Sequence, residues 1–209
     1  MERIIAKELL SIGAVFLRPE QPFTWASGIK SPIYCDNRLT LSAPSVRDRI
    51  ENGLAELVRK YYPECEMLMG TSTAGIAHAA ITATILDMPM GYVRGEAKTH
   101  GRTNRIEGRM EPGTKVVVIE DLISTGGSAI EVVQALREEG AQVLGIVSIF
   151  TYGMKKGIER IAAAETENHS LSNLDALVEV AVDEGYIAPE WKDRIIAFRD
   201  NPSDESWIK

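Results

Sequence analysis

Cysteine is scarce in this sequence, with only Cys35 and Cys65 among 209 residues. The two lie thirty positions apart and have no spacing typical of a metal site, so the sequence predicts neither a disulfide framework nor a zinc centre. We interpret both as small side chains that fill space in the core. Two unpaired thiols fit a reducing compartment, and the prediction is a cytoplasmic protein.

Long hydrophobic runs are also missing. The longest apolar stretch, residues 74–93, is interrupted by His78, Asp87 and Pro89 and is rich in alanine and threonine, which disfavours a membrane span. The first residues do not have the layout of a signal peptide. We therefore expect no membrane partner.

An excess of positive charge is absent as well. The formal net charge is −7 and the pI is about 5.1. Proteins that bind nucleic acid non-specifically usually have a strongly basic surface, so no nucleic-acid partner is predicted. A small anionic substrate is still compatible with this balance, because a site needs only local positive charge, and the basic residues within 94–109 supply it.

Short apolar runs alternate with helical periodicity along most of the chain, which we interpret as one domain over residues 1–209. The spacing predicts helices at 3–12, 44–60, 76–86 and 128–139, and strands at 67–69, 90–94, 115–119 and 143–150. Such alternation predicts an α/β fold with a mainly parallel sheet, over about residues 62–150, that helices cover on both faces.

The segments outside this alternation have their own character. Residues 14–41 contain short extended pieces broken by proline and glycine, and we expect a small hood there. Residues 95–113 have almost no apolar periodicity and predict a loop. The last third of the chain is predicted to be helical, with a capping box at residues 172–175 and a further helix at 189–200. His78 is expected in the core.

The most informative segment is Val116–Ser128, in which an apolar strand delivers Glu120 and Asp121 to a loop of small residues. Sheets of this class place ligands at the carboxyl ends of their strands. Glycines let backbone N–H groups approach an anion, and the following helix adds positive partial charge. Carboxylates suit sugar hydroxyls or a metal ion. The alternative is an ordinary turn in which Ser128 and Glu131 form a capping box.

This segment resembles the phosphoribosyl-pyrophosphate-binding motif of type I phosphoribosyltransferases. The resemblance implies that family's fold, with Glu120 and Asp121 binding the ribose hydroxyls. It implies that seven residues after these acids also bind phosphoribosyl pyrophosphate: Leu122, Ile123, Ser124, Thr125, Gly126, Gly127 and Ser128. The last five of them, from Ser124 to Ser128, would hold its 5′-phosphate. It also implies a magnesium ion, Mg2+, that pyrophosphate and ribose hold and to which the protein contributes no direct ligand.

Three other segments resemble one branch, the orotate phosphoribosyltransferases. Residues 92–101 resemble that branch's mobile catalytic loop, which would span 95–110 here. Residues 23–32 are similar to its N-terminal signature, and residues 70–75 to its pyrophosphate loop. With the motif above, the resemblance runs in order over roughly residues 20–150.

The resemblance implies a transferase that joins orotate to the ribose phosphate of phosphoribosyl pyrophosphate in pyrimidine biosynthesis. Its catalytic residues would be Lys98, His100 and Asp121, and Arg94, Lys98 and His100 would contact phosphoribosyl pyrophosphate. It also implies a homodimer with shared active sites. Ser124 is expected to contact orotate. Tyr34 and Cys35 either present backbone groups to the base or fill space.

The sequence departs from the family pattern at several positions. Better-known members carry lysines where this chain has Ala26, Ala74 and Gly95, and an arginine near Tyr152-Gly153 that would meet the orotate carboxylate has no clear counterpart. The candidates to compensate are Lys30, Tyr152 and Lys155. Two alternatives stay open: a phosphoribosyltransferase for another base, and a regulator of this fold that senses phosphoribosyl pyrophosphate and binds nucleic acid.

Overall fold

A six-stranded sheet forms the centre of the computed structural model, which describes residues 1–25, 28–95 and 105–208. The spatial order of the strands is β10-β9-β8-β5-β6-β7. Their bounds are β5 Met67–Thr71, β6 Met90–Val93, β7 Ile106–Glu107, β8 Lys115–Ile123, β9 Gln142–Thr151 and β10 Asn168–Asn173. All neighbours are parallel except β6 and β7. The predicted α/β class and the mainly parallel sheet are confirmed.

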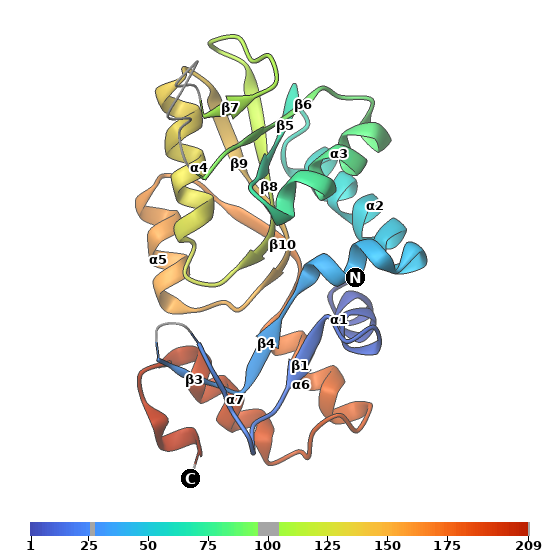
Figure 1. Cartoon of the computed structure of the whole chain (residues 1–209), viewed down its shortest axis with the longest axis vertical. Helices are drawn as coiled ribbons and strands as arrows, with labels where there is room; N and C mark the ends of the chain where they lie inside the picture. Colours follow the sequence, from blue (N-terminus) through green and yellow to red (C-terminus); the bar gives the residue numbers. More distant parts are fainter. Residues whose placement is uncertain (26–27, 96–104, 209) are drawn as a thin grey trace.

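Helices cover both faces of this sheet (Figure 1). On one side lie α2 (Pro44–Tyr61) and α3 (Ala74–Leu86), and on the other α4 (Gly127–Glu138) and α5 (Lys155–Ala163). Successive residues of β8 enter different cores: Val117 and Ile119 pack with the α2–α3 side, and Val116 and Val118 with the α4 side. Because side chains alternate across a strand, a strand covered on both faces must be apolar at every position.

A second layer, built from both ends of the chain, lies against the carboxyl end of the sheet (Figure 1). Its N-terminal part is the hood, which contains two antiparallel strand pairs and a 3-10 helix: β1 Val15–Leu17 with β4 Ile33–Cys35, β2 Phe23–Thr24 with β3 Lys30–Ser31, and η1 Asn37–Ser42. Its C-terminal part is formed by α6 Leu174–Asp183, α7 Trp191–Asp200 and η2 Glu205–Ile208. Helix α1 (Glu2–Ser11) packs on α6.

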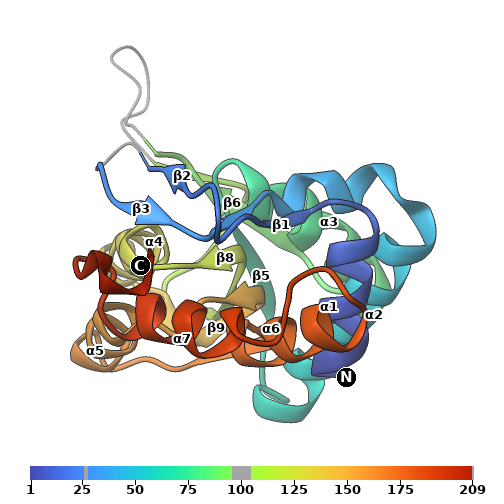
Figure 2. The ribbon, with the colours of Figure 1, turned by 90° about the horizontal axis from the view of Figure 1, so that it is seen from below.

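Aromatic side chains hold the hood to the C-terminal helices. The ring of Trp25 lies 5.8 Å from that of Phe198 and 6.0 Å from that of Tyr152, and Phe198 lies 5.6 Å from Trp207. The pairs that Phe198 forms with Trp25 and Trp207 are edge-on, and such pairs add to the free energy gained by burying the rings. Viewed from below, the end of β8 is seen between the hood strands and helices α6 and α7 (Figure 2).

The structure corrects the prediction of an all-helical last third. Residues 168–173 form β10, an edge strand whose polar sequence lacks the alternation by which strands are predicted. Helix α6 is capped by Asn173, whose Oδ1 accepts from the Ala176 N–H at 2.9 Å, and Ser172 instead bonds the Glu2 carbonyl. His169 is partly buried and stacks on Tyr61 at 3.6 Å.

Two further boundaries differ from the sequence-based expectation. The segment expected as a loop from Gly70 to Gly75 begins inside β5 and ends inside α3. Strand β8 continues past Ile119 to Ile123, so the two acids lie within the strand and not after it. The expected burial of His78 is confirmed: its Nδ1 lies 2.6 Å from Glu51 Oε1 between α3 and α2. Among the described residues, no helix has the length and apolar character needed to cross a membrane.

Close packing at Gly75 fixes how α3 meets the sheet. A methyl group on Gly75 would overlap the carbonyl oxygen of Ile119 in β8 and the hydroxyl of Thr71 in β5. Alanine normally stabilises a helix interior by about 1 kcal/mol relative to glycine. At this position the overlap must be relieved by moving backbone, which costs about 1–3 kcal/mol.

We therefore predict that Gly75→Ala lowers the free energy of unfolding, measured by denaturant titration. Gly95→Ala is the matched control, because a methyl group at Gly95 would meet none of the described residues within 4 Å, and it should change stability by less than about 0.5 kcal/mol. Equal stability of the two variants would contradict the packing argument.

Candidate active site

The carboxyl end of β8 places a buried acid next to a half-exposed one. Glu120 is 5 % exposed, whereas Asp121 is half-buried, because neighbouring residues of a strand point to opposite faces. Glu120 Oε1 accepts two hydrogen bonds, from the Thr71 hydroxyl at 2.8 Å and from the Asp121 N–H at 2.9 Å. The end of β5 and the backbone of β8 therefore fix the orientation of this carboxyl group.

Burial governs the protonation of Glu120. Burial, and after it the Asp121 carboxylate alongside, together raise the pKa of this carboxyl from its ordinary 4.5 to about 8, although the bond from Thr71 acts in the opposite direction. In the free protein at neutral pH, Glu120 is thus largely neutral. A ligand that donates hydrogen bonds to Glu120 favours its ionised form.

The loop after β8 surrounds a small cavity of about 90 Å³. Its lining residues all belong to this one segment, Glu120 and residues 122–129. Gly126 has φ +72°, which turns the chain into α4, and α4 begins at Gly127 with no side-chain cap from any of the described residues. The alternative of a capping box headed by Ser128 is therefore wrong. Uncapped N–H groups at a helix N-terminus are suited to bind an anion such as a phosphate.

Helix α5 supports this loop from outside. Arg160 donates to the Thr125 carbonyl at 3.2 Å, and a side chain at Gly157 would lie 2.6 Å from the Ser124 carbonyl oxygen. The loop therefore rests directly on the backbone of α5. The sequence offered no signal for either contact, since the partners lie more than thirty positions apart.

The hood brings Tyr34 and Cys35 over the same end of the sheet. Tyr34 is 43 % exposed, and its ring lies 5.7 Å from that of Phe23. Burial, with Asp121 and Asp36 nearby, raises the pKa of the Cys35 thiol well above its ordinary value. Burial also raises the pKa of the Tyr152 hydroxyl. The thiol stays protonated and is therefore unsuited to act as a nucleophile.

Two residues at this site were missed by the sequence analysis. Thr71 bonds Glu120, and Asn37, the first residue of η1, donates from Nδ2 to the Asp121 carbonyl at 2.7 Å. Their partners lie 49 and 84 positions away along the chain. Only the folded chain brings these groups together, although Thr71 stands in the small-residue segment that the resemblance singled out.

The basic residues expected at the site are only partly described. Arg94 follows β6 at the same edge of the sheet; its N–H bonds the Arg105 carbonyl, and its Nη1 lies 3.4 Å from Glu107 Oε1. The Ser72 hydroxyl donates to the carbonyl of Val93, just before it. Lys98 and His100 lie outside the described residues.

The candidates for the missing family cations lie in different surroundings. Lys30 Nζ bonds Thr24 within the hood at 2.8 Å. Lys155 lines a cavity of about 480 Å³ beside Thr125, which Trp25 and Arg199 also line. The aliphatic part of Arg199 lies 3.8 Å from where a Cβ on Gly153 would stand, but its guanidinium pairs with Asp175 at 2.6 Å.

Similarity to known proteins agrees with this geometry. Residues 41–184 match the family model described as "Phosphoribosyl transferase domain". The orotate phosphoribosyltransferase of Bacillus cereus (strain G9842) is 57% identical over 208 residues, covering 100% of this chain and 99% of that protein. The chain belongs to the orotate phosphoribosyltransferase family.

Solved structures show the same fold, which is that of the type I phosphoribosyltransferases. The orotate phosphoribosyltransferase of Aeropyrum pernix superposes with a TM-score of 0.76 at 29% identity, over 88% of this chain and 99% of that one. Leishmania donovani UMP synthase gives a TM-score of 0.80 at 26% identity over 94% of this chain. This chain matches 41% of the length of that UMP synthase.

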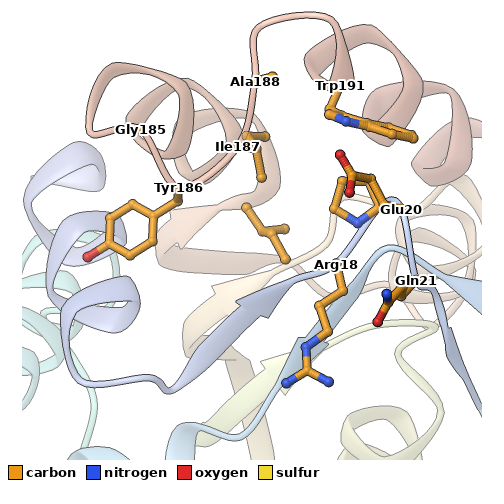
Figure 3. Close-up of a pocket in the computed structure, with 10 residues that line it drawn as sticks. Arg18, Glu20, Gln21, Gly185, Tyr186, Ile187, Ala188 and Trp191 are labelled. Atoms are coloured by element: carbon orange, nitrogen blue, oxygen red, sulfur yellow. The ribbon is translucent and has the colours of Figure 1, made fainter.

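A further pocket, of about 390 Å³, lies away from the candidate site of this orotate phosphoribosyltransferase family member (Figure 3). The turn after β1 and the connection from α6 to α7 form it, with Arg18, Glu20, Tyr186 and Trp191 among its labelled side chains. The pocket includes no residue of β8 or of the loop that follows it. This pocket is therefore separate from the candidate site at the carboxyl end of β8.

The raised pKa of Glu120 predicts a specific dependence of stability on pH. Glu120 binds its proton more tightly in the folded than in the unfolded protein, so its contribution to stability is complete below about pH 4.5 and is lost as pH rises through about 8. Between pH 5 and pH 9, the free energy of unfolding of Glu120→Gln should therefore rise relative to that of the wild type, by at least about 1 kcal/mol.

Denaturant titrations at several pH values measure this difference. Glu138→Gln, which alters an exposed acid at the end of α4, is the matched control and should follow the wild type. A constant difference between Glu120→Gln and wild type across this range would show that the folded protein does not raise the pKa of Glu120.

Proposed function

We propose that the chain transfers a phosphoribosyl group from phosphoribosyl pyrophosphate to orotate. The bond from C1′ to the pyrophosphate oxygen breaks, a bond from C1′ to a ring nitrogen of orotate forms, and that nitrogen gives up its proton. The products are orotidine 5′-monophosphate and pyrophosphate, a step of pyrimidine synthesis. The observation that carries the proposal is the buried Glu120 beside Asp121 and an uncapped helix N-terminus, in a chain of this family.

In this proposal, the end of β8 and the loop that follows it bind different parts of the substrate. Glu120 and Asp121 accept hydrogen bonds from the ribose hydroxyls, and residues 124–128 hold the 5′-phosphate, with Ser124 also in contact with the base. As pyrophosphate leaves, the sugar gains positive charge, which fixed carboxylates stabilise. Holding both substrates in line supplies the rest of the catalysis.

The described residues favour a metal ion that arrives with its substrate. They contain no group of three or more histidine, cysteine, aspartate or glutamate side chains arranged to hold a metal ion. Glu120 is largely neutral in the free protein and is engaged by Thr71, which leaves the Asp121 carboxylate as the nearest anionic donor. We propose Mg2+ bound mainly by pyrophosphate and ribose oxygens; when bound, it neutralises charge on the leaving group.

Arg94, together with Lys98 and His100, is proposed to stabilise the departing pyrophosphate. On the resemblance stated above, Lys98 and His100 reach the site of a second copy, so the active unit is a homodimer. Helix α3 supports a dimer: apart from His78 it has no ionisable side chain, and Ile76, Ile81 and Ile85 remain partly exposed on it. An apolar helix of this kind needs cover on more than one face.

We further propose a cytoplasmic location. Both substrates are anions, which do not cross lipid without a carrier. Cys35 and Cys65 are both free thiols, and these suit a reducing compartment.

The direct test is a panel of bases, each supplied with phosphoribosyl pyrophosphate and magnesium. Orotate should be consumed, with release of pyrophosphate, and adenine and xanthine should not. Asp121→Asn should lower kcat/KM for orotate by about a hundredfold or more, because an amide no longer offsets the positive charge on the sugar. Turnover of another base in preference to orotate would contradict the proposal. Binding of DNA or RNA by a protein that turns over none of the bases would contradict it as well.

Mixed dimers test whether the sites are shared. Lys98→Ala and Asp121→Asn should each be nearly inactive alone. If the loop acts across the dimer, a hybrid has one intact site and one doubly altered site. Since half of randomly mixed dimers are hybrids, mixing should restore roughly a quarter of wild-type activity. Gel filtration and subunit exchange establish that hybrids form. Proven hybrids that stay inactive would place the loop in its own subunit's site.

A further inference from the structure

Asn37 connects the hood to the catalytic strand through a fully buried amide. Its Nδ2 donates to the main-chain carbonyl of Asp121 at 2.7 Å, and its Oδ1 accepts from the Cys35 thiol at 3.2 Å. Both ends of the amide therefore have partners. A flipped amide would place its oxygen against the carbonyl of Asp121, so the two contacts fix one orientation.

The bond to Asp121 occupies a place where the sheet has an open edge. Strand β5 pairs with β8 only as far as Gly70 opposite Ile119. Beyond that point, β8 continues to Ile123 without a β5 partner. A partly buried carbonyl that lacks a donor costs free energy, and Asn37 supplies the donor here. The side chain thus extends the hydrogen bonding of the sheet from outside it.

We propose that Asn37 is a positioning residue for the transfer reaction. It sets the distance between β4, where Tyr34 and Cys35 would present backbone groups to the base, and β8, where Asp121 would meet the ribose. This inference rests on the proposed function. Each substrate still meets its own contacts without Asn37, but the base and C1′ are no longer held in line. Displacement of reacting groups by about 1 Å costs on the order of a hundredfold in rate.

The first test compares Asn37→Ala with a matched control. Ser172 is also fully buried and also bonds a distant main-chain carbonyl, that of Glu2 at 2.9 Å, but joins β10 to α1. With orotate and phosphoribosyl pyrophosphate, Asn37→Ala should lower kcat at least about tenfold, while KM for phosphoribosyl pyrophosphate changes less than about threefold. Ser172→Ala should keep kcat within about twofold of wild type.

The second test uses Asn37→Asp, which keeps the shape of the side chain. In its protonated form this acid can donate to the Asp121 carbonyl while its other oxygen accepts from Cys35. In its ionised form it donates nothing and stands near Asp121 and Asp36, the latter paired with Arg38 at 2.6 Å. Activity of Asn37→Asp relative to wild type should therefore be highest at low pH and fall as pH rises, towards that of Asn37→Ala.

The outcomes separate the two proposals. A wild type inactive with orotate contradicts the proposed function itself. If the wild type is active, equal activity of Asn37→Asp and Asn37→Ala at every pH overturns the role of Asn37. The role is also overturned if Ser172→Ala loses as much kcat as Asn37→Ala at equal loss of stability.

Discussion

The two hydrogen bonds to Glu120 are the interaction on which the rest of the site depends. A carboxyl group that is 5 % exposed needs donors, and it obtains them from the Thr71 hydroxyl and from the N–H of Asp121. Thr71 reaches it only because β5 lies beside β8 and Gly75 lets α3 approach without a side chain. The order of strands and the identity of one glycine therefore determine where an ionisable group stands at the sheet's carboxyl end.

The same arrangement separates the charges that the proposed reaction needs. Acidic groups stand at the end of β8, and the uncapped N-terminus of α4 lies a few residues further along the chain. The N-terminus of α4 attracts an anion, and the acids at the end of β8 favour a sugar that becomes positive. Glu120 stays protonated until a ligand donates to it, which limits the repulsion between two adjacent acids in the free protein.

Local patterns of the sequence predicted much of this fold and part of the site. The apolar strands, the helices after them and the run from Val116 to Ser128 have clear signals, because burial on both faces and a tight glycine-rich turn from β8 into α4 impose composition directly. Strand β10 has no such signal, since its polar residues pair with β9 at the edge of the sheet. Asn37 and Arg160 were not predictable, because each acts on backbone far away along the chain.

The ribose contact of Glu120 is the central claim, and proton release measures it most directly. If ribose hydroxyls donate to Glu120, binding of phosphoribosyl pyrophosphate ionises a carboxyl group whose pKa is about 8 in the free protein. Calorimetric titrations at pH 7, in two buffers of different ionisation enthalpy, give the number of protons released. Wild type should release close to one proton more than Glu120→Gln. Equal proton release by the two proteins, at comparable affinity, would contradict the account.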